Sequence, residues 1–351
     1  MAAYVSCPAV ALPEHQVPTN AVLADIARAQ EGQPGLSAAL RIVKSLRVDH
    51  RFWSLPLEEL TLPQGIEARN RWTVEAVYQL GAQAARDALR AARLDAGEVD
   101  CLIPVHSSGI AMPGLGVHLA RVLGLRPDVL HVPVTQVGCT GGSWGLALAA
   151  QLVAAQPGRR VLLVVSEALS SCYRPAEPGI VSAMYSGLFG DCGAAAVVTS
   201  DWRAPGLRID DWWTYLLPDS STCYWMEPDV EGQRFASTPA ALRAVTACMP
   251  DLVERLKAVP QSAWPVWMAA HPGGPRIIES QAAGLPDAPD LAHAWESLRE
   301  HGNPGGPAVL DVLRRHYADP PAHGAPGLVA GFGPGFFGAA VYGAWMEHAE
   351  N

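Results

Sequence analysis

The sequence contains little charge and almost no lysine. Charged residues make up 17% of the 351 residues, and Lys44 and Lys257 are the two lysines. Acidic residues outnumber basic ones by 34 to 25, so the formal net charge is −9. Because proteins that bind nucleic-acid phosphates need a basic field, the composition argues against a nucleic-acid partner. With 49% hydrophobic residues, the chain is also too apolar for an intrinsically disordered protein.

Recognisable disulfide, metal and membrane motifs are absent as well. The seven cysteines are irregularly spaced and include no CxxC pair, so neither a disulfide framework nor a zinc site is expected. Residues 1–13 lack the basic and apolar segments of a signal peptide. The longest uncharged stretch, residues 129–158, is interrupted by proline, glycine and glutamine, so no membrane span is expected. We expect a cytoplasmic protein with reduced thiols and no metal.

Short apolar runs alternate with helical patterns, which predicts an α/β fold. The expected strands lie at residues 101–106, 161–166, 193–199, 264–271 and 328–332. The expected helices lie at residues 74–92, 143–155 and 240–259; the second is apolar on nearly all sides, which is typical of a buried helix. A polar passage near residues 200–206 predicts a boundary between two α/β halves, residues 1–202 and 203–351.

Cys139 is the strongest candidate for a nucleophile. It lies in a glycine-flanked segment, residues 136–142, that opens the predicted buried helix. The positive end of the helix dipole and nearby backbone N–H groups favour the thiolate, which is the reactive form of cysteine. Glycines on either side allow a ligand to approach the backbone closely. The alternative is that Cys139 is a small buried core residue, as most free cysteines are.

Two further residues have the chemistry that an acylated cysteine would need. His271 ends an apolar run and is followed by Pro-Gly-Gly, and Asn303 precedes a proline in a glycine-rich segment. Taken alone, each is explained as a turn residue. Together with Cys139 they suit acyl transfer with decarboxylation, because the thiolate accepts an acyl group while imidazole and amide N–H groups donate hydrogen bonds to an enolate oxygen. A carboxylate in place of the amide would oppose that negative charge.

Six short motifs lie in order along almost the whole chain. They are SGIAMPG at residues 108–114, QVGCTGG at 136–142, GLFGD at 187–191, AHPGGP at 270–275, GN at 302–303 and GFGPG at 331–335. In these motifs the chain resembles the type III polyketide synthases, the family of chalcone synthase and the bacterial tetrahydroxynaphthalene synthases. The resemblance implies a thiolase fold, with two similar α/β halves in a layered αβαβα arrangement, and a homodimer. It also implies CoA thioesters as substrates, with no cofactor.

The resemblance assigns roles to individual residues. Cys139 would be the nucleophile that carries the growing chain. His271 and Asn303 would bind the thioester carbonyl and stabilise the enolate that forms when malonyl-CoA loses CO2. Phe189 and Phe235 would be gatekeepers between the CoA tunnel and the cavity.

Other residues would shape the cavity or its surroundings. Met112 would reach into the partner's cavity, and Arg41 and Lys44 would bind the CoA phosphates, with an ordinary solvated helix face as the alternative. The residues matched to the cavity are Ser107, Glu167, Leu169, Cys172, Met226 and Gly305. Met226 stands where the plant enzyme has a glycine that makes room for an aromatic starter, which implies a small or aliphatic starter. Neutral drift in a cavity wall is the alternative explanation for these residues.

Together these observations predict an iterative polyketide synthase. It would condense malonyl-CoA onto a small acyl-CoA starter, with malonyl-CoA itself as one candidate, and cyclise the chain to a small aromatic or pyrone. One alternative is a β-ketoacyl-carrier-protein synthase III, which condenses once; the Pro-Gly-Gly after His271 and the lack of a basic patch argue against it. The other is a non-catalytic acyl-CoA-binding homologue, which the intact set of Cys139, His271 and Asn303 argues against.

The two cysteines singled out above make different predictions. We expect Cys139→Ala to form no product from malonyl-CoA, because the acyl group loses its attachment site. Cys172→Ala should retain condensation, because its proposed place is in the cavity wall. Incubation with ¹⁴C-labelled malonyl-CoA and chromatography of the labelled products measures both. Full-length polyketide from the Cys139 variant would show that the nucleophile lies elsewhere.

Overall fold

The computed structural model describes residues 2–201, 204–259 and 263–347. The predicted boundary between the two halves, at residues 202 and 203, lies outside the described residues. The strand β1 (Ala3–Val5) pairs on one side with β9 (Asp191–Thr199) and on the other with β10 (Gly206–Leu216). Hydrogen bonding therefore runs without a break from strands before the predicted boundary to strands after it.

The main sheet has 11 strands in the order β13-β14-β15-β10-β1-β9-β8-β5-β6, with β2 paired to β9 and β7 paired to β5. Its remaining strands are β2 (Ala9–Ala11), β5 (Cys101–His106), β6 (Leu130–His131), β7 (Val134–Thr135), β8 (Val161–Ala168), β13 (Trp267–Ala270), β14 (Pro326–Gly333) and β15 (Phe337–Met346). One pairing pattern occurs twice. β5 and β8 are parallel and β9 is antiparallel to β8, just as β13 and β14 are parallel and β15 is antiparallel to β14.

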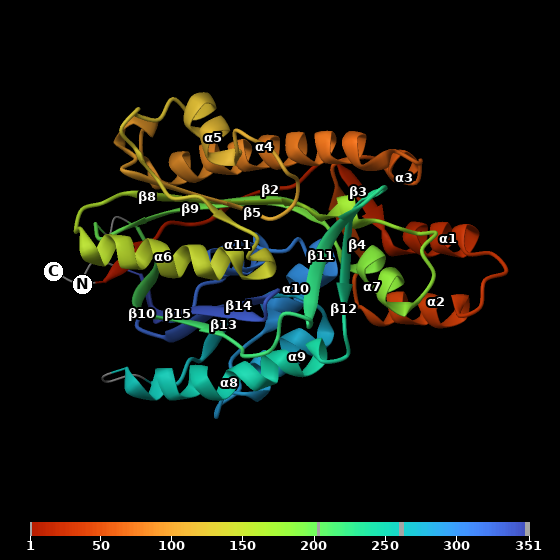
Figure 1. Cartoon of the computed structure of the whole chain (residues 1–351). Helices are drawn as coiled ribbons and strands as arrows, with labels where there is room; N and C mark the ends of the chain where they lie inside the picture. The colour runs from red at the N-terminus through yellow and green to blue at the C-terminus, as the bar shows by residue number, and fades with distance from the viewer. Residues whose placement is uncertain (1, 202–203, 260–262, 348–351) are drawn as a thin grey trace.

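Some helices pack between the two ends of this sheet, and others cover their outer faces. The helices are α1 (Thr19–Ala29), α2 (Leu36–Ser45), α3 (Leu57–Leu60), α4 (Gly65–Ala92), α5 (Leu115–Leu123), α6 (Gly141–Ala155), α7 (Ile180–Leu188), α8 (Ala241–Ala258), α9 (Pro275–Ala283), α10 (Ala292–His301) and α11 (Ala308–Ala318). α4 and α5 lie over β5, β8 and β9, α6 and α11 lie between these strands and β10, β13, β14 and β15, and α8 and α9 cover the opposite side (Figure 1). This is the expected layered α/β arrangement.

Two small two-stranded sheets and three short 3₁₀ helices complete the fold. β3 (His15–Pro18) pairs with β4 (His50–Trp53) across α1 and α2, and β11 (Tyr224–Asp229) forms a hairpin with β12 (Gly232–Ser237). The 3₁₀ helices are η1 (Ala96–Glu98), η2 (Gly138–Thr140) and η3 (Leu169–Cys172). β11 and β12 run past α7 and the end of α9 (Figure 1). They form no part of the main sheet and are free to contribute a wall to a cavity.

The predicted strands and helices are all present, and the differences lie at their ends. The strand predicted at 264–271 covers Trp267–Ala270, and the helix predicted at 240–259 covers Ala241–Ala258. The helix predicted at 74–92 begins nine residues earlier, at Gly65. Its first turns bury Arg69 and Thr73 instead of apolar side chains, so the apolar periodicity does not reveal them.

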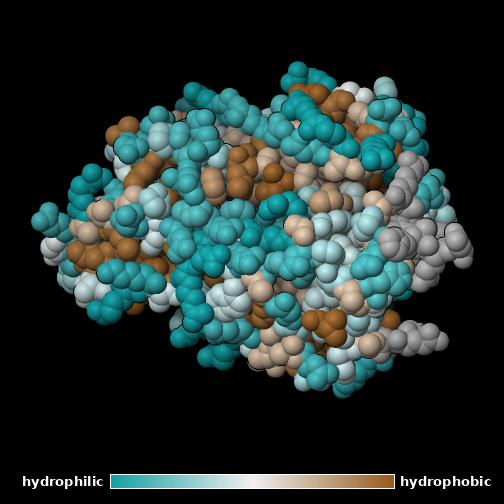
Figure 2. Space-filling model, turned by 180° about the vertical axis from the view of Figure 1, so that it is seen from behind, coloured by the Kyte–Doolittle hydropathy of each residue, from teal (hydrophilic) through white to brown (hydrophobic). Residues whose placement is uncertain are grey.

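The molecular surface carries both polar and apolar side chains. The face opposite to that of Figure 1 is largely polar, with separate small apolar groups (Figure 2). Large apolar side chains around the start of α5 are exposed, among them Ile110, Val117 and Met112, the last at 98%. Within the described residues, every helix is too short or too polar to cross a lipid bilayer.

α4 and β9 pack so closely that a substitution adding a single methyl group can test their contact. A Cβ atom at Gly193 would lie 2.4 Å from the carbonyl oxygen of Leu80 in α4. We expect Gly193→Ala to lower the free energy of unfolding by about 1–3 kcal/mol, because the helix backbone must move. Gly97→Ala, where no atom lies within 4 Å, is the matched control and should change it by less than about 0.5 kcal/mol. Urea denaturation measures both; equal effects would contradict the close packing.

Candidate functional site

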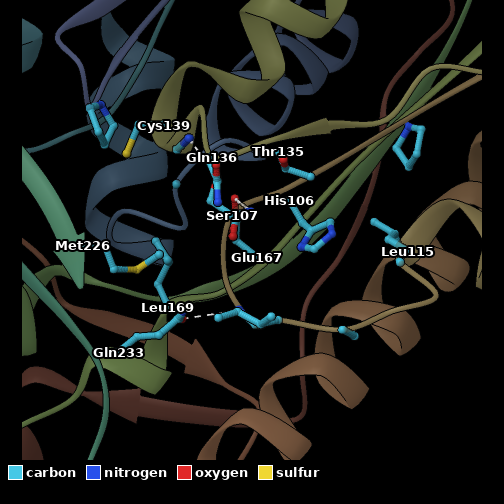
Figure 3. A pocket seen from close by; sticks show the side chains of 18 of the residues that line it. His106, Ser107, Leu115, Thr135, Gln136, Cys139, Glu167, Leu169, Met226 and Gln233 are labelled. Atoms are coloured by element: carbon cyan, nitrogen blue, oxygen red, sulfur yellow. Dashed lines mark hydrogen bonds between the residues drawn. The ribbon is translucent and has the colours of Figure 1, made fainter. Parts of the chain in front are cut away.

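A cavity with a volume of about 570 Å³ lies where β5, η2, β8 and the β11–β12 hairpin meet. Figure 3 shows Cys139, Glu167, Leu169 and Met226 along its wall. Eight residues that the sequence analysis assigned to the site line it: Ser107, Cys139, Glu167, Leu169, Phe189, Met226, Phe235 and Gly305. A volume of this size is typical of a small-molecule site.

Cys139 lies in η2, one residue before the final residue of that turn and two before the start of α6. The predicted placement at a helix N-terminus is therefore confirmed. The predicted effect on the thiol is not, because burial raises the pKa of Cys139 to about 12 and outweighs the lowering effect of a hydrogen bond from Asn303. The desolvated environment favours the neutral thiol until another group removes its proton.

Asn303 is the residue in closest polar contact with the sulfur. Its Nδ2 donates to Cys139 Sγ over 3.9 Å, and its Oδ1 accepts a hydrogen bond of 2.9 Å from Gly305 N. The Asn303 backbone is held by Leu188, whose carbonyl oxygen accepts from Asn303 N at 2.8 Å. The amide is thus fixed at both ends, with its N–H groups directed to the nucleophile.

His271 follows the last residue of β13 and continues its hydrogen bonding, since His271 N donates to Ala330 O at 3.0 Å. Gln281 fixes the same backbone, because its Nε2 donates to His271 O at 2.9 Å. Burial lowers the pKa of His271 to about 3, so the ring is neutral at physiological pH. Its buried Nδ1 has no hydrogen-bond partner among the described residues.

β14 connects His271 to the nucleophile. Ala330 of this strand bonds to His271, and the next residue, Gly331, packs against the start of α6. A Cβ atom at Gly331 would lie 3.3 Å from Cys139 O. The structure therefore brings Asn303 into contact with Cys139. His271 bonds to Ala330, and the neighbouring residue Gly331 packs against the turn that contains Cys139. No hydrogen bond joins the Cys139 and His271 side chains.

Glu167 is the centre of a hydrogen-bond network in the cavity wall. Its carboxylate accepts hydrogen bonds from Ser107 N at 2.9 Å, Ser108 N at 2.8 Å and Ser108 Oγ at 2.6 Å. Ser107 Oγ in turn accepts from Gly138 N at 2.9 Å, next to Cys139. Burial raises the pKa of Glu167 to about 7, although these hydrogen bonds oppose the shift. Ser108 was not predicted as a site residue, although its position next to the predicted residue Ser107 could have indicated it.

Two residues of the cavity wall, Phe189 and Phe235, belong to a cluster of aromatic rings. Phe189 and Phe235 meet edge to face, with ring centroids 5.2 Å apart. Tyr185 stacks on Phe189 at 5.1 Å and contacts Phe235 at 4.7 Å. Tyr224 lies 6.0 Å from Phe235. The two tyrosines were not predicted, although Tyr224 alternates with Met226 along β11 and so shares its face.

Six predicted residues are not among those that line the cavity: His271, Asn303, Cys172, Arg41, Lys44 and Met112. Cys172 is buried in η3 and is not among the lining residues, so the expectation that it faces the cavity is not met; Leu169, at the start of the same turn, faces it instead. Arg41 and Lys44 are exposed on α2, and neither lines the cavity. Met112 points into solvent from this single chain. No cluster of metal-binding side chains occurs in the described ranges.

Comparisons with known proteins agree on one family. The family model described as chalcone and stilbene synthases, N-terminal domain, matches residues 57–202. The chain is 31% identical to a 1,3,6,8-tetrahydroxynaphthalene synthase of Streptomyces griseus, over 97% of the chain and 92% of that protein. It is 28% identical to a phloroglucinol synthase of Pseudomonas fluorescens, over 96% and 98%. The solved structure of germicidin synthase from Streptomyces coelicolor, a type III polyketide synthase, matches with a TM-score of 0.93 and 34% identity, over 99% and 100%.

The raised pKa of Glu167 predicts a pH-dependent stability. Below pH 4.5 the carboxyl is protonated in folded and unfolded chains, and its stabilising contribution is fully present. As pH rises towards 7, Glu167 ionises first in the unfolded chain. The free energy of unfolding therefore falls by on the order of 3 kcal/mol relative to that of Glu167→Gln, which cannot ionise. Urea unfolding at pH 4.5, 6 and 8 measures the difference. The exposed control Glu58→Gln should show no such trend, and a constant difference for Glu167→Gln would contradict the assignment.

Proposed function

The chain belongs to the type III polyketide synthases, and we propose that Cys139, His271 and Asn303 perform its condensation chemistry. The observation that carries this proposal is the 3.9 Å contact between Asn303 Nδ2 and Cys139 Sγ at the wall of a cavity of about 570 Å³. A nucleophile and an N–H donor that meet in a desolvated pocket are the elements that acyl transfer to sulfur requires.

Loading begins with proton transfer. Burial favours the neutral forms of both the Cys139 thiol and the His271 imidazole, so the thiol passes its proton to the imidazole only as the bound thioester is attacked. The thiolate attacks the thioester carbonyl, the new C–S bond forms, and the C–S bond to CoA breaks. The proton taken up by His271 leaves with the CoA thiol, which regenerates the neutral ring.

Extension then uses the same N–H donors. Malonyl-CoA loses CO2, and the electron pair of the broken C–C bond forms an enolate. Asn303 Nδ2–H and the His271 ring N–H donate to the enolate oxygen, which spreads the negative charge over fixed dipoles. The enolate carbon attacks the acyl group on Cys139, the new C–C bond forms and the thiolate is released for the next cycle. Repeated extension fills the cavity, and cyclisation gives a small aromatic or pyrone product.

The cavity wall supports a small or aliphatic starter. Met226 of β11 pairs with Phe235 of β12, and both side chains line the space near Leu169. These apolar side chains occupy volume that a bulky aromatic starter would need. Malonyl-CoA itself remains among the proposed starters, and no other cofactor is required because decarboxylation supplies the carbanion.

The surroundings of the cavity support further parts of the proposal. Exposed Arg41 and Lys44 on α2 are proposed to bind the CoA phosphates, in a chain with two lysines in all. Met112, which is 98% exposed, is proposed to enter the cavity of a second copy in a homodimer. Since CoA thioesters are intracellular metabolites, the cytoplasm is the proposed location.

The decisive experiment supplies purified protein with ¹⁴C-malonyl-CoA, with and without short acyl-CoA starters, and identifies products by mass spectrometry. We expect CO2 release and a cyclised polyketide. Asn303→Asp should lower CO2 release and polyketide formation by about 10²–10³-fold, because a carboxylate repels the enolate. Asn20→Asp, at an exposed position of α1, should leave both unchanged.

The same experiment separates the alternatives. A strict requirement for malonyl-carrier protein, or a single condensation, would point to a β-ketoacyl-carrier-protein synthase and contradict the proposal. Full activity of Asn303→Asp would remove the amide from the mechanism.

A further inference from the structure

A second pocket of about 230 Å³ adjoins the cavity at the side of the β11–β12 hairpin. Ile110, Pro228 and Gln233 line both spaces, so the two are neighbours separated by these side chains. Gln233 stands at the cavity wall, where its Oε1 accepts a hydrogen bond of 3.3 Å from Gly109 N (Figure 3). Arg69, Thr73 and Ser171 also line this second pocket. No step of the proposed reaction uses it.

Arg69 is a buried cation that has no counterion of its own. It is 7% exposed, and Nη1 donates one hydrogen bond, to Ser171 O at 3.2 Å. Its Nε is buried and has no hydrogen-bond partner in the described part of the chain. None of the ion pairs formed between described residues includes it. A guanidinium has five N–H donors, so most of its hydrogen-bonding capacity is unused.

The acidic side chains nearest to Arg69 are already occupied. Asp229 makes two hydrogen bonds to Arg174, at 2.7 and 2.8 Å, and Glu231 makes a third at 3.3 Å. Glu67 lines the second pocket but is exposed and pairs with Arg71 at 2.6 Å. Arg174 therefore takes both nearby carboxylates, and it repels Arg69.

Burial lowers the pKa of Arg69 and the charge of Arg174 lowers it further, although Glu231 and Asp229 oppose the shift. A guanidinium nevertheless stays protonated. An unpaired buried charge is costly, and an anion of matching geometry relieves that cost. Arginine is suited to this because its planar N–H groups fit a carboxylate in a bidentate manner.

We propose that this pocket binds a carboxylate at the far end of an acyl chain attached to Cys139, with Arg69 as the specificity-determining residue. The synthase would accordingly accept ω-carboxyacyl groups, as starters or as intermediates that keep a terminal carboxylate. The inference rests on the proposed function for the attachment to Cys139, and the pocket and its unpaired arginine are independent of it. Gln233, which borders both spaces, would move aside or hydrogen-bond to the chain that passes.

The test compares two starters of equal length, adipoyl-CoA and hexanoyl-CoA, which differ in a terminal carboxylate. For Arg69→Gln we expect kcat/KM for adipoyl-CoA to fall at least tenfold, while kcat/KM for hexanoyl-CoA changes less than twofold. Arg69→Lys, which keeps the positive charge, should recover part of the adipoyl-CoA activity. Arg86→Gln, at an exposed position of the same helix that lines neither pocket, is the matched control and should alter neither.

A second measurement needs no variant. Wild-type protein acylated on Cys139 with an adipoyl group should have a higher melting temperature than the hexanoylated protein, because the carboxylate neutralises Arg69. An equal or lower melting temperature would overturn the proposal, as would an equal fall in kcat/KM for both starters in Arg69→Gln or no fall at all. Failure of the proposed function is seen separately, since Cys139→Ala would then still turn over both starters.

Discussion

The close approach of α6 to the loop after Asn303 and to strand β14 is the constraint on which the site depends. A Cβ atom at Gly142 would lie 2.5 Å from Gly306 O, and one at Gly331 would lie 2.6 Å from Ser143 Oγ. Side chains at these positions would push the start of α6 away from the Asn303 loop and from β14. Because Cys139 lies just before α6, the same contacts set its distance from Asn303 and from the strand that holds His271. The nucleophile and its partners come from segments more than 130 residues apart, and backbone packing alone brings them together.

Desolvation is the second consequence of that packing. It raises the pKa values of Cys139 and Glu167 and lowers that of His271, so each group is driven towards its neutral form. A resting site of neutral groups does not attract water or free ions strongly. In the proposed mechanism, proton transfer and decarboxylation create charge next to the Asn303 amide, which is already held against Cys139. The helix N-terminus at Cys139 contributes to this field, but it is weaker than the effect of burial on the resting thiol.

Different parts of the cavity wall have different chemistry. Phe189 and Phe235 give it an apolar part, and Tyr185 and Tyr224 pack against these rings. The Glu167–Ser107–Gly138 hydrogen bonds form a polar part that reaches the turn of Cys139. The neighbouring pocket, which shares Gln233 with the cavity, adds the positive charge of Arg69. The cavity and this second pocket together present apolar, polar and cationic surfaces.

The sequence by itself was sufficient for the alternation of strands and helices, for the buried helix α6 and for the ordered motifs that contain Cys139, His271 and Asn303, because each depends on local periodicity or on short spacing. Through the family resemblance it also indicated eight of the 25 residues that line the cavity. Tertiary structure alone decided that Cys172 turns away from the cavity while Leu169 faces it, and that burial makes the Cys139 thiol neutral despite its helix position. It alone revealed Tyr185, Tyr224 and the unpaired Arg69. These properties depend on which distant segments exclude water from a side chain and which carboxylates are already paired, and neither is encoded in the spacing of residues along the chain.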